Sequence, residues 1–334
     1  MKKTLSLILA AMLLLSLVPA CAEDAKTPSV CIVVAESLGD RSFYDSAKSG
    51  IDALAADFGT ETNVIECKGD GSLYESSLFE AAERYDIVAA VGWQFIDALA
   101  DENGVLAAYP DKKFIFVDNT LEVIPENLMC ISYAQNEGSF LAGYAAANLS
   151  TTGAVGVVGG EDGIVINDFI VGYEAGARYA REDIRVERQY ANTYDDPAKG
   201  KECALALYNG GCDVVFAVAG KTGEGVFEAA KEVNRLAVGV DGDQKYIDPD
   251  HIICSMVKEV GKSIYDVVAH PDEFFKGGQV WTANMATGYI DVVYGTEDMP
   301  QQISPQLKEE VEALKAKIIN GDIVVPSAFA AAEE

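Results

Sequence analysis

The sequence predicts an α/β protein with two doubly wound lobes, and three observations lead to this fold class. Short β-rich runs alternate with helix-length segments along most of the 334-residue chain. Several of these runs are apolar throughout, which is typical of parallel strands that are covered on both faces. The alternation forms two series of similar length, and this favours two lobes over one long sheet.

The first series begins with SVCIVVAE at residues 29–36, which predicts a buried parallel strand. A helical pattern of apolar residues follows as far as Phe58. Further helices are predicted at about residues 73–83 and 95–108. The remaining strands of this series are predicted in NVIECK, YDIVAAVGW, KKFIFVDN and NLMCISYA.

The second series follows a helix that is predicted at about residues 137–149. Its strands are predicted in GAVGVVGG, IRVERQYA, CDVVFAVAG and LAVGVDGD. Helices are expected between them at about residues 165–181, 199–208 and 225–234. This order of strands and helices predicts a second parallel sheet like the first.

The last part of the chain adds segments that suit a return between the lobes. Residues 251–268 begin as a strand and continue as a helix, and residues 279–293 look extended. The predicted lobes are residues 28–134 with about 255–290, and residues 135–254 with about 291–325.

The N-terminus carries a predicted signal peptide over residues 1–22. Lys2 and Lys3 precede an apolar stretch that ends near Val18 and is too short to span a membrane. LVPAC ends at Cys21 and resembles a lipobox, in which this cysteine is lipidated and anchors the protein to the cell membrane. ACA also fits ordinary signal cleavage, so a soluble secreted or periplasmic protein is the alternative. Both interpretations predict export.

Charge and cysteine content exclude several classes of function. Without the signal peptide, 23 basic residues face 53 acidic ones, so the net charge is about −30. Such a surface repels phosphate groups, so nucleic acid is not an expected partner. The six remaining cysteines form no C-x-x-C pair and the chain has two histidines, so no metal site or other cofactor is expected. Four of these cysteines lie in or beside apolar runs, which favours buried free thiols.

Polar and aromatic residues gather where the predicted strands end. In parallel α/β sheets, ligands lie beyond the carboxyl ends of the strands. The first strand is followed by Asp40, Phe43, Tyr44 and Asp45. The other candidates at strand ends are Trp93, Gln94, Asp118, Asn119, Gly220, Asp241, Asp243 and Lys258. Two lobes that face each other would bring these residues into one cleft.

Simpler roles remain open for single residues. Asp40 or Ser42 could cap the helix that follows, Phe43 could anchor its first turn in the core, and Lys258 could be solvated. GKTGEG lacks the spacing of a phosphate-binding loop, and no dinucleotide fingerprint follows the first strand. No G-x-S-x-G or H-E-x-x-H motif is present, so the chain is not expected to be an enzyme.

Several motifs together resemble one family. DRSFYDSAKSGI, FVDN, NEGSFLAGYAAA and VGVDGDQ occur in the order expected of the basic membrane protein family, the nucleoside-binding receptors of ABC transporters. The resemblance covers roughly Ser29 to Ile290. It implies a type I periplasmic-binding fold with two α/β lobes, a multi-strand hinge and a nucleoside in the cleft. A purine nucleoside is expected over a pyrimidine nucleoside.

The resemblance also implies roles for residues that would contact the base. Phe43 and Phe169 match the aromatic residues that stack on the base in the family. Asp118 matches an acid that binds the edge of the base. Stacking of this kind contributes about 1–3 kcal/mol for each base and tolerates different bases.

The implied sugar contacts come from the second half of the chain. Asp241 and Lys258 match the acid and the base that hold the ribose hydroxyls, and Gly220 matches a backbone contact near the sugar. A carboxylate that accepts hydrogen bonds from two hydroxyls would require a nucleoside rather than a free base.

Two residues depart from the pattern of the family. Tyr44 stands where the family commonly has an asparagine that bonds the base, and Lys221 replaces a glycine near the sugar. A phenol offers one donor, whereas an amide offers two donors and an acceptor. A sugar or another polar metabolite therefore remains an alternative ligand, and Lys221 could accommodate a more anionic one.

As a whole, the sequence predicts an exported receptor, anchored through Cys21, that closes two lobes over a nucleoside and presents it to an ABC permease. It is expected to act as a monomer and to carry out no chemistry on the ligand. An extracellular nucleoside-processing enzyme is the alternative from another class, but no cluster of aspartates typical of a metal site follows the first strand. A sensory receptor of the same fold is a further alternative.

Overall fold

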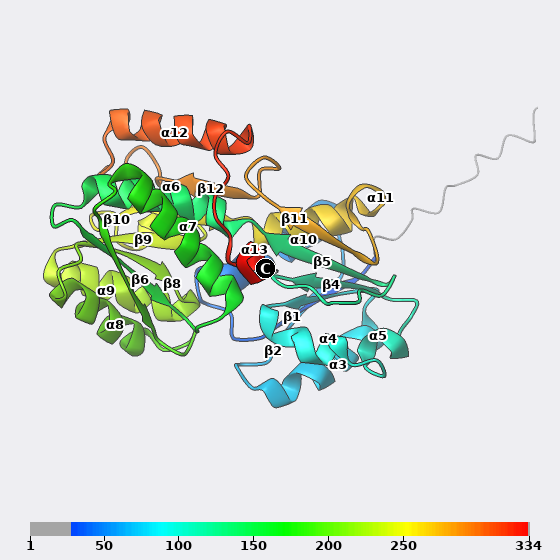
Figure 1. Ribbon diagram of the computed structural model, residues 1–334. Coiled ribbons are helices and arrows are strands. Elements are labelled where there is room, and N and C mark those ends of the chain that lie inside the picture. The colour runs from blue at the N-terminus through cyan, green and yellow to red at the C-terminus, as the bar shows by residue number, and fades with distance from the viewer. Residues whose placement is uncertain (1–27, 333–334) are drawn as a thin grey trace, which may run out of the picture.

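A computed structural model describes residues 28–332, and Figure 1 shows them as two α/β lobes that lie side by side. The sheet of the first lobe contains β1 (Val30–Val34), β2 (Thr62–Glu66), β3 (Ile87–Val91), β4 (Lys113–Val117), β5 (Leu128–Tyr133) and β11 (Gln279–Ala283). Its strand order is β11-β5-β4-β3-β1-β2, and the neighbouring strands are parallel. The order reverses beside β1, where a doubly wound sheet opens a crevice for ligands.

The second sheet repeats the winding of the first. It contains β6 (Ala154–Gly159), β7 (Arg185–Tyr190), β8 (Val214–Val218), β9 (Leu236–Asp241), β10 (Ile252–Lys258) and β12 (Ile290–Val293). The strand order is β12-β10-β9-β8-β6-β7, in which β12 is antiparallel to β10 and the other pairs are parallel. The prediction of two doubly wound α/β lobes is therefore confirmed.

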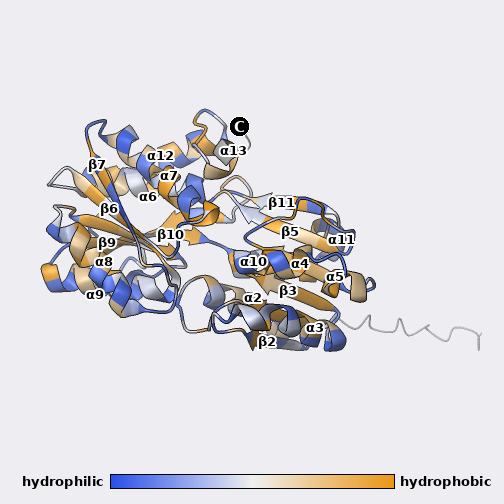
Figure 2. Ribbon diagram, turned by 60° about the horizontal axis from the view of Figure 1, so that its bottom comes forward, coloured by the Kyte–Doolittle hydropathy of each residue, from blue (hydrophilic) through white to orange (hydrophobic). Residues whose placement is uncertain are grey.

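Helices cover the faces of both sheets (Figure 1). Those of the first lobe are α2 (Phe43–Phe58), α3 (Tyr74–Arg84), α4 (Ile96–Ala100), α5 (Val105–Ala108), α10 (Val260–Ala269) and α11 (Pro271–Phe274). Those of the second are α6 (Gln135–Leu149), α7 (Ile164–Ala180), α8 (Pro197–Asn209), α9 (Glu224–Val233) and α12 (Pro305–Ile319), and the short α13 (Ala328–Ala332) follows. The central strands β1 and β3 are fully buried, and Figure 2 shows the sheets as hydrophobic layers between helices of mixed hydropathy.

The single helix expected at residues 95–108 is wrong, because the structure has two short helices there, α4 and α5. The Asp101 side chain accepts a hydrogen bond of 2.9 Å from the backbone N–H of Asn103, which makes a turn before α5. The helix α12 was not among the predicted elements. Its first turn is marked by Ser304, whose hydroxyl accepts from the N–H of Leu307, and by the proline that follows.

Three crossings join the lobes and form the hinge. The chain crosses at Ala134, at Glu259 and between β11 and β12. The N–H of Ala134 donates to the carbonyl of Ala283, and the N–H of Glu259 donates to the carbonyl of Tyr289, each at 2.9 Å. These bonds tie the crossings to one another, so the lobes are joined by a connected bundle of strands.

The hinge lies a few residues from its predicted place. Strand β10 pairs with both β9 and β12, and its ladder with β12 extends to Lys258. Residues 255–258 therefore belong to the second sheet instead of the first lobe. The stretch at 279–293 is extended, but it divides into β11 and β12, which lie in different sheets.

The predicted signal peptide, residues 1–22 with Cys21, lies outside the residues that the structure describes. Within residues 28–332, no helix is long and apolar enough to cross a membrane. The six cysteines of this range are buried, and their thiols are free.

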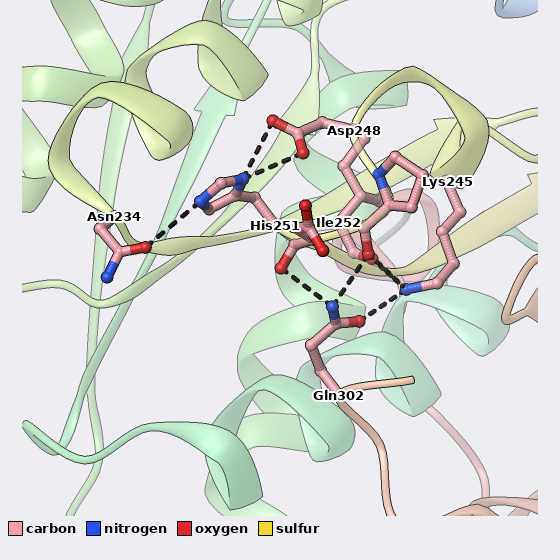
Figure 3. Close-up of polar contacts among 8 residues, drawn as sticks. Asn234, Lys245, Asp248, His251, Ile252 and Gln302 are labelled. Atoms are coloured by element: carbon pink, nitrogen blue, oxygen red, sulfur yellow. Dashed lines mark hydrogen bonds and ion pairs between the residues drawn. The ribbon is translucent and has the colours of Figure 1, made fainter. Parts of the chain in front are cut away.

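A buried cluster of polar residues fastens the C-terminal part of the chain to the second lobe (Figure 3). The ammonium of Lys245 is fully buried and donates to the carbonyl of Ile252 (2.5 Å) and to the side-chain oxygen of Gln302 (2.6 Å). Burial lowers the pKa of Lys245. Beside it, Nδ1 of His251 lies 3.0 Å from both carboxylate oxygens of Asp248. Since none of these residues lines the cavity between the lobes, we assign the cluster a structural role.

Candidate functional site

A cavity lies between the two lobes, at the carboxyl ends of both sheets. Its lining includes eight of the nine predicted ligand-binding residues: Asp40, Phe43, Tyr44, Asp118, Phe169, Gly220, Asp241 and Lys258. The helix α2 and the turns after β1, β3 and β4 provide the residues of the first lobe, whereas α7 and the ends of β8, β9 and β10 provide most of those of the second. Residues more than 200 positions apart in the sequence therefore meet in one place.

An ion pair crosses the cavity from one lobe to the other. Lys258, at the end of β10, donates from Nζ to Oδ1 of Asp118, which follows β4, at 2.8 Å. The two residues are 1% and 7% exposed, so water screens their attraction weakly. Burial raises the pKa of Asp118, and the charge of Lys258 opposes this shift.

Two phenyl rings from opposite lobes face the same charged group. Nζ of Lys258 lies 4.9 Å from the ring centroid of Phe43 and 5.0 Å from that of Phe169. Both distances lie within the range of a cation–π contact. The ring of Tyr133, at the end of β5, is 5.1 Å from the same atom. Phe43 and Phe169 thus line the cavity beside the buried ammonium group of Lys258, which also lines it.

Asp118 and Asp241 occupy equivalent positions at the ends of β4 and β9. Their φ angles are +78° and +63°, in the left-handed region that aspartate tolerates better than most residues. Oδ2 of Asp241 accepts a hydrogen bond of 2.7 Å from the hydroxyl of Ser42, and Oδ1 is buried without a partner among the described residues. Burial raises the pKa of Asp241, while Lys258 and Ser42 lower it.

The corner after β1 serves both as a helix cap and as a wall of the cavity. The carboxylate of Asp40 accepts hydrogen bonds from the N–H groups of Ser42, Tyr44 and Asp45 at 3.0–3.1 Å. It therefore caps α2 while the residue lines the cavity. Both roles that the sequence suggests for Asp40 are compatible with this geometry.

Asp45 is not brought into the cavity, which corrects its placement among the cleft residues. Its carboxylate accepts hydrogen bonds from the N–H groups of Gly39 (2.8 Å) and Arg41 (2.9 Å). Asp45 lies two residues after Phe43, about 200° further around the helix, so the two side chains point in different directions. The role of Asp45 is to hold the loop that positions Phe43.

Lys221 also lies apart from the cavity lining. Its ammonium pairs with a carboxylate oxygen of Asp195 at 2.5 Å, and the two side chains are 37% and 45% exposed. Because the ammonium of Lys221 is paired with Asp195, it is not available to an anionic ligand in the cavity.

The sequence analysis did not identify Tyr194, which lines the cavity from the second lobe. It follows β7 by four residues, so the rule that ligands lie beyond strand ends would have found it. Trp93 and Gln94, which follow β3, do reach the cavity as that rule predicts.

Direct contacts hold the two lobes in a closed arrangement. The hydroxyl of Ser42 in the first lobe reaches Asp241 in the second. The side-chain amide of Gln244 donates to the carbonyl of Arg41 at 3.1 Å, and the guanidinium of Arg41 lies 3.6 Å from Glu224. Opening the cleft would break these bonds, so they favour the closed form.

Glu36 gives the stability of the folded protein a predicted dependence on pH. Burial, with the charges of Asp195 and Glu161 from the other lobe, raises its pKa from 4.5 to about 7. Between pH 4.5 and about pH 7, Glu36 is more often protonated in the folded protein than in the unfolded chain. The free energy of unfolding therefore falls as the pH rises through this range. We expect the melting temperature to decrease from pH 5 to pH 8, and Glu36→Gln to flatten this slope. Glu83→Gln, at an exposed position, is the control. An unchanged slope in Glu36→Gln would contradict the assignment.

Comparison with known proteins identifies similar sequences over nearly the whole chain. Residues 27–328 match the family model Bmp, described as ABC transporter substrate-binding protein PnrA-like. Basic membrane protein A of Borreliella burgdorferi is 32% identical over 311 residues, which cover 91% of this chain and 89% of that protein. The ABC transporter nucleoside-binding protein BmpA of Lactococcus lactis subsp. cremoris is 34% identical over 321 residues, with coverages of 88% and 87%.

Solved structures show the same architecture. An ABC transporter solute-binding protein from Aeropyrum pernix K1 superposes with a TM-score of 0.79 at 26% identity, over 89% of this chain and 93% of that one. A periplasmic solute-binding protein from Actinobacillus succinogenes 130z has a TM-score of 0.60 at 15% identity, over 80% and 97% of the two chains, and shares the fold. The type I periplasmic-binding fold is thereby confirmed. With the family matched over residues 27–328, this chain belongs to the Bmp family of ABC transporter substrate-binding proteins.

Proposed function

We propose that this protein captures a nucleoside, with a purine as the preferred base, in the cavity between its lobes. In this proposal Phe43 and Phe169 stack on the base, and Asp118 binds its edge. Asp241 and Lys258 hold the ribose hydroxyls, and the backbone of Gly220 lies near the sugar. The matched family and the Lactococcus relative are described as binding proteins of ABC transporters. In this proposal the protein therefore binds and releases the nucleoside without changing it chemically.

The observation that carries this proposal is the buried Oδ1 of Asp241, which has no partner among the described residues. A buried carboxylate oxygen is stabilised when a donor reaches it, and a ribose hydroxyl provides one. The phenyl rings of Phe43 and Phe169 suit a flat ring system beside it. A nucleoside combines the two features, whereas a free base lacks the hydroxyls and a simple sugar lacks the flat ring. The name of the Lactococcus relative supports the same ligand class.

A thermal-shift screen against nucleosides, free bases, pentoses and hexoses tests the proposal, and calorimetry measures the affinity for each hit. Nucleosides should raise the melting temperature, because a ligand that binds the folded state stabilises it. Free bases should have a much smaller effect. Stabilisation by sugars alone would contradict the proposal and would indicate a sugar receptor of the same fold.

Phe43→Ala should weaken nucleoside binding by about 1–3 kcal/mol, because it removes one stacking surface. Phe58→Ala is a matched control, since Phe58 lies at the far end of the same helix, is 47% exposed and does not line the cavity. Calorimetry on the two variants gives the comparison. Equal affinities in Phe43→Ala and the wild type would exclude the stacking role.

We also propose that the protein is exported, that a lipid on Cys21 anchors it, and that it acts as a monomer with an ABC permease. The two lobes would close on the nucleoside, and the closed form would then be recognised by the permease. The strongly acidic composition supports a lipid anchor over electrostatic attachment to a membrane of anionic lipids.

A further inference from the structure

One part of the cavity wall carries neutral polar groups instead of charges. Gln94 lies in the short turn Trp93–Phe95 after β3, and Tyr44 lies in the first turn of α2. Gly92 adopts a φ of +121°, and a Cβ atom there would lie 2.6 Å from Oε1 of Gln94 and 3.2 Å from the hydroxyl oxygen of Tyr44. The amide oxygen of Gln94 and the hydroxyl oxygen of Tyr44 therefore both lie close to Gly92. A side chain at position 92 would occupy the space between them.

The amide oxygen of Gln94 is buried and has no hydrogen-bond partner within residues 28–332. The hydroxyl of Tyr194, which lines the same cavity from the other lobe, is likewise buried and unpartnered among the described residues. Such atoms are rare in folded proteins, because they have lost their bonds to water without replacement. A ligand that donates a hydrogen bond to Gln94 would supply the missing partner.

The charged groups of the cavity have other contacts. Asp118 bonds to Lys258, and Asp241 accepts from Ser42. In the proposed function these groups serve the sugar and one edge of the base. The neutral groups Gln94, Tyr44 and Tyr194 are then available for a second edge of the base. Tyr44 is also adjacent to the stacking residue, since its ring centroid lies 5.0 Å from that of Phe43.

We propose that Gln94, supported by Tyr44, is a specificity-determining residue that selects purine nucleosides whose six-membered ring presents an N–H donor. This inference rests on the proposed nucleoside function. A glutamine amide accepts and donates at the same time, which is how glutamine reads the amino group and a ring nitrogen of adenine in nucleic acids. The N1–H and O6 of a 6-oxopurine also provide one donor and one acceptor. Purine riboside has no 6-substituent and no N–H on that ring, so it offers no donor to Oε1.

Calorimetry with adenosine, inosine and purine riboside on the full chain tests the inference. Gln94→Leu keeps the side chain near its natural size but removes both polar atoms. We expect it to weaken adenosine and inosine binding by about tenfold or more. Purine riboside binding should weaken several-fold less, because that ligand loses only the bond that the amide nitrogen donates to a ring nitrogen. Gln306→Leu, at an exposed position on α12, is the matched control and should leave all three affinities unchanged.

The possible outcomes separate this inference from the function on which it rests. If the wild type binds adenosine and Gln94→Leu binds it equally well, Gln94 does not read the base. An equal loss for all three ligands would show a structural role and would also overturn the inference. In both cases the proposed function survives, whereas a wild type that binds no nucleoside overturns both. Tyr44→Phe removes a single hydroxyl, so it provides the second variant if Gln94→Leu fails to fold, and it should show the same order of losses.

Discussion

Replacing Asp241 with asparagine is expected to weaken nucleoside binding by about 100-fold or more, the largest change in affinity that we predict. The carboxylate is 7% exposed and lies at the end of β9, where it also faces the buried charge of Lys258. Asparagine has nearly the same shape and tolerates the positive φ of this position, so the fold should persist. What it loses is the negative charge and one of two acceptor oxygens. Calorimetry on the wild type and the variant measures the difference.

A control variant and a comparison of two ligands test whether Asp241 acts on the ribose. Asp243→Asn changes an exposed carboxylate two residues further on, which accepts a hydrogen bond from the N–H of Lys245 and does not line the cavity. Its affinity for nucleosides should equal that of the wild type. A free base makes no ribose contact, so its weak binding should change little in Asp241→Asn. An equal loss for the nucleoside and the free base would place the ribose elsewhere.

Replacing Gly176 with alanine is expected to destabilise the fold by about 3 kcal/mol or more, because it forces two helix backbones apart. A Cβ atom at this position of α7 would lie 1.8 Å from the carbonyl oxygen of Phe140 in α6. One turn earlier, a Cβ at Gly172 would lie 2.2 Å from the carbonyl oxygen of Asn136. The two helices therefore pack backbone against backbone, and no side-chain rotamer can relieve the overlap.

The same helix offers a matched control for this stability change. Gly163 precedes α7 as its N-cap, its φ is negative, and a Cβ atom there would have no neighbour within 4 Å. Gly163→Ala should therefore change the free energy of unfolding by about 1 kcal/mol or less, because its only expected cost is that alanine makes a weaker N-cap than glycine. Denaturant unfolding of the two variants measures the contrast. A Gly176→Ala protein as stable as the control would mean that α6 and α7 can separate freely.

The positions of most strands could be predicted because strand formation depends on local pattern. Runs such as that around β1 are apolar throughout and are buried on both faces, so their sequence alone marks them as central strands. The rule for strand ends then predicted, without any knowledge of packing, that Asp118 and Asp241 lie in the cleft, and both line the cavity. It failed to separate Asp40 from Asp45, since both follow the same strand, and the direction of each side chain depends on where the helix begins.

The details of the cavity depend on contacts that no local pattern records. Asp118 and Lys258 are 140 positions apart, and their separation of 2.8 Å exists because the two lobes are closed. Lys221 was a candidate for ligand binding by its position in the sequence, but its partner Asp195 lies 26 residues away and holds it outside the cavity. The amide oxygen of Gln94, which has no partner in the described part of the chain, likewise owes its position to the way the turn after β3 lies beside Tyr44 of α2.

The sequence by itself determined the two α/β lobes, the family and the gathering of polar and aromatic residues at the strand ends, because these follow from periodicity and from motifs read along the chain. Only the tertiary structure decided which of the strand-end groups share one cavity, where the hinge lies and which polar atoms still lack a partner. The physical reason is that a hydrogen bond or an ion pair depends on distance and direction in space. Those are fixed by the packing of segments far apart in the sequence.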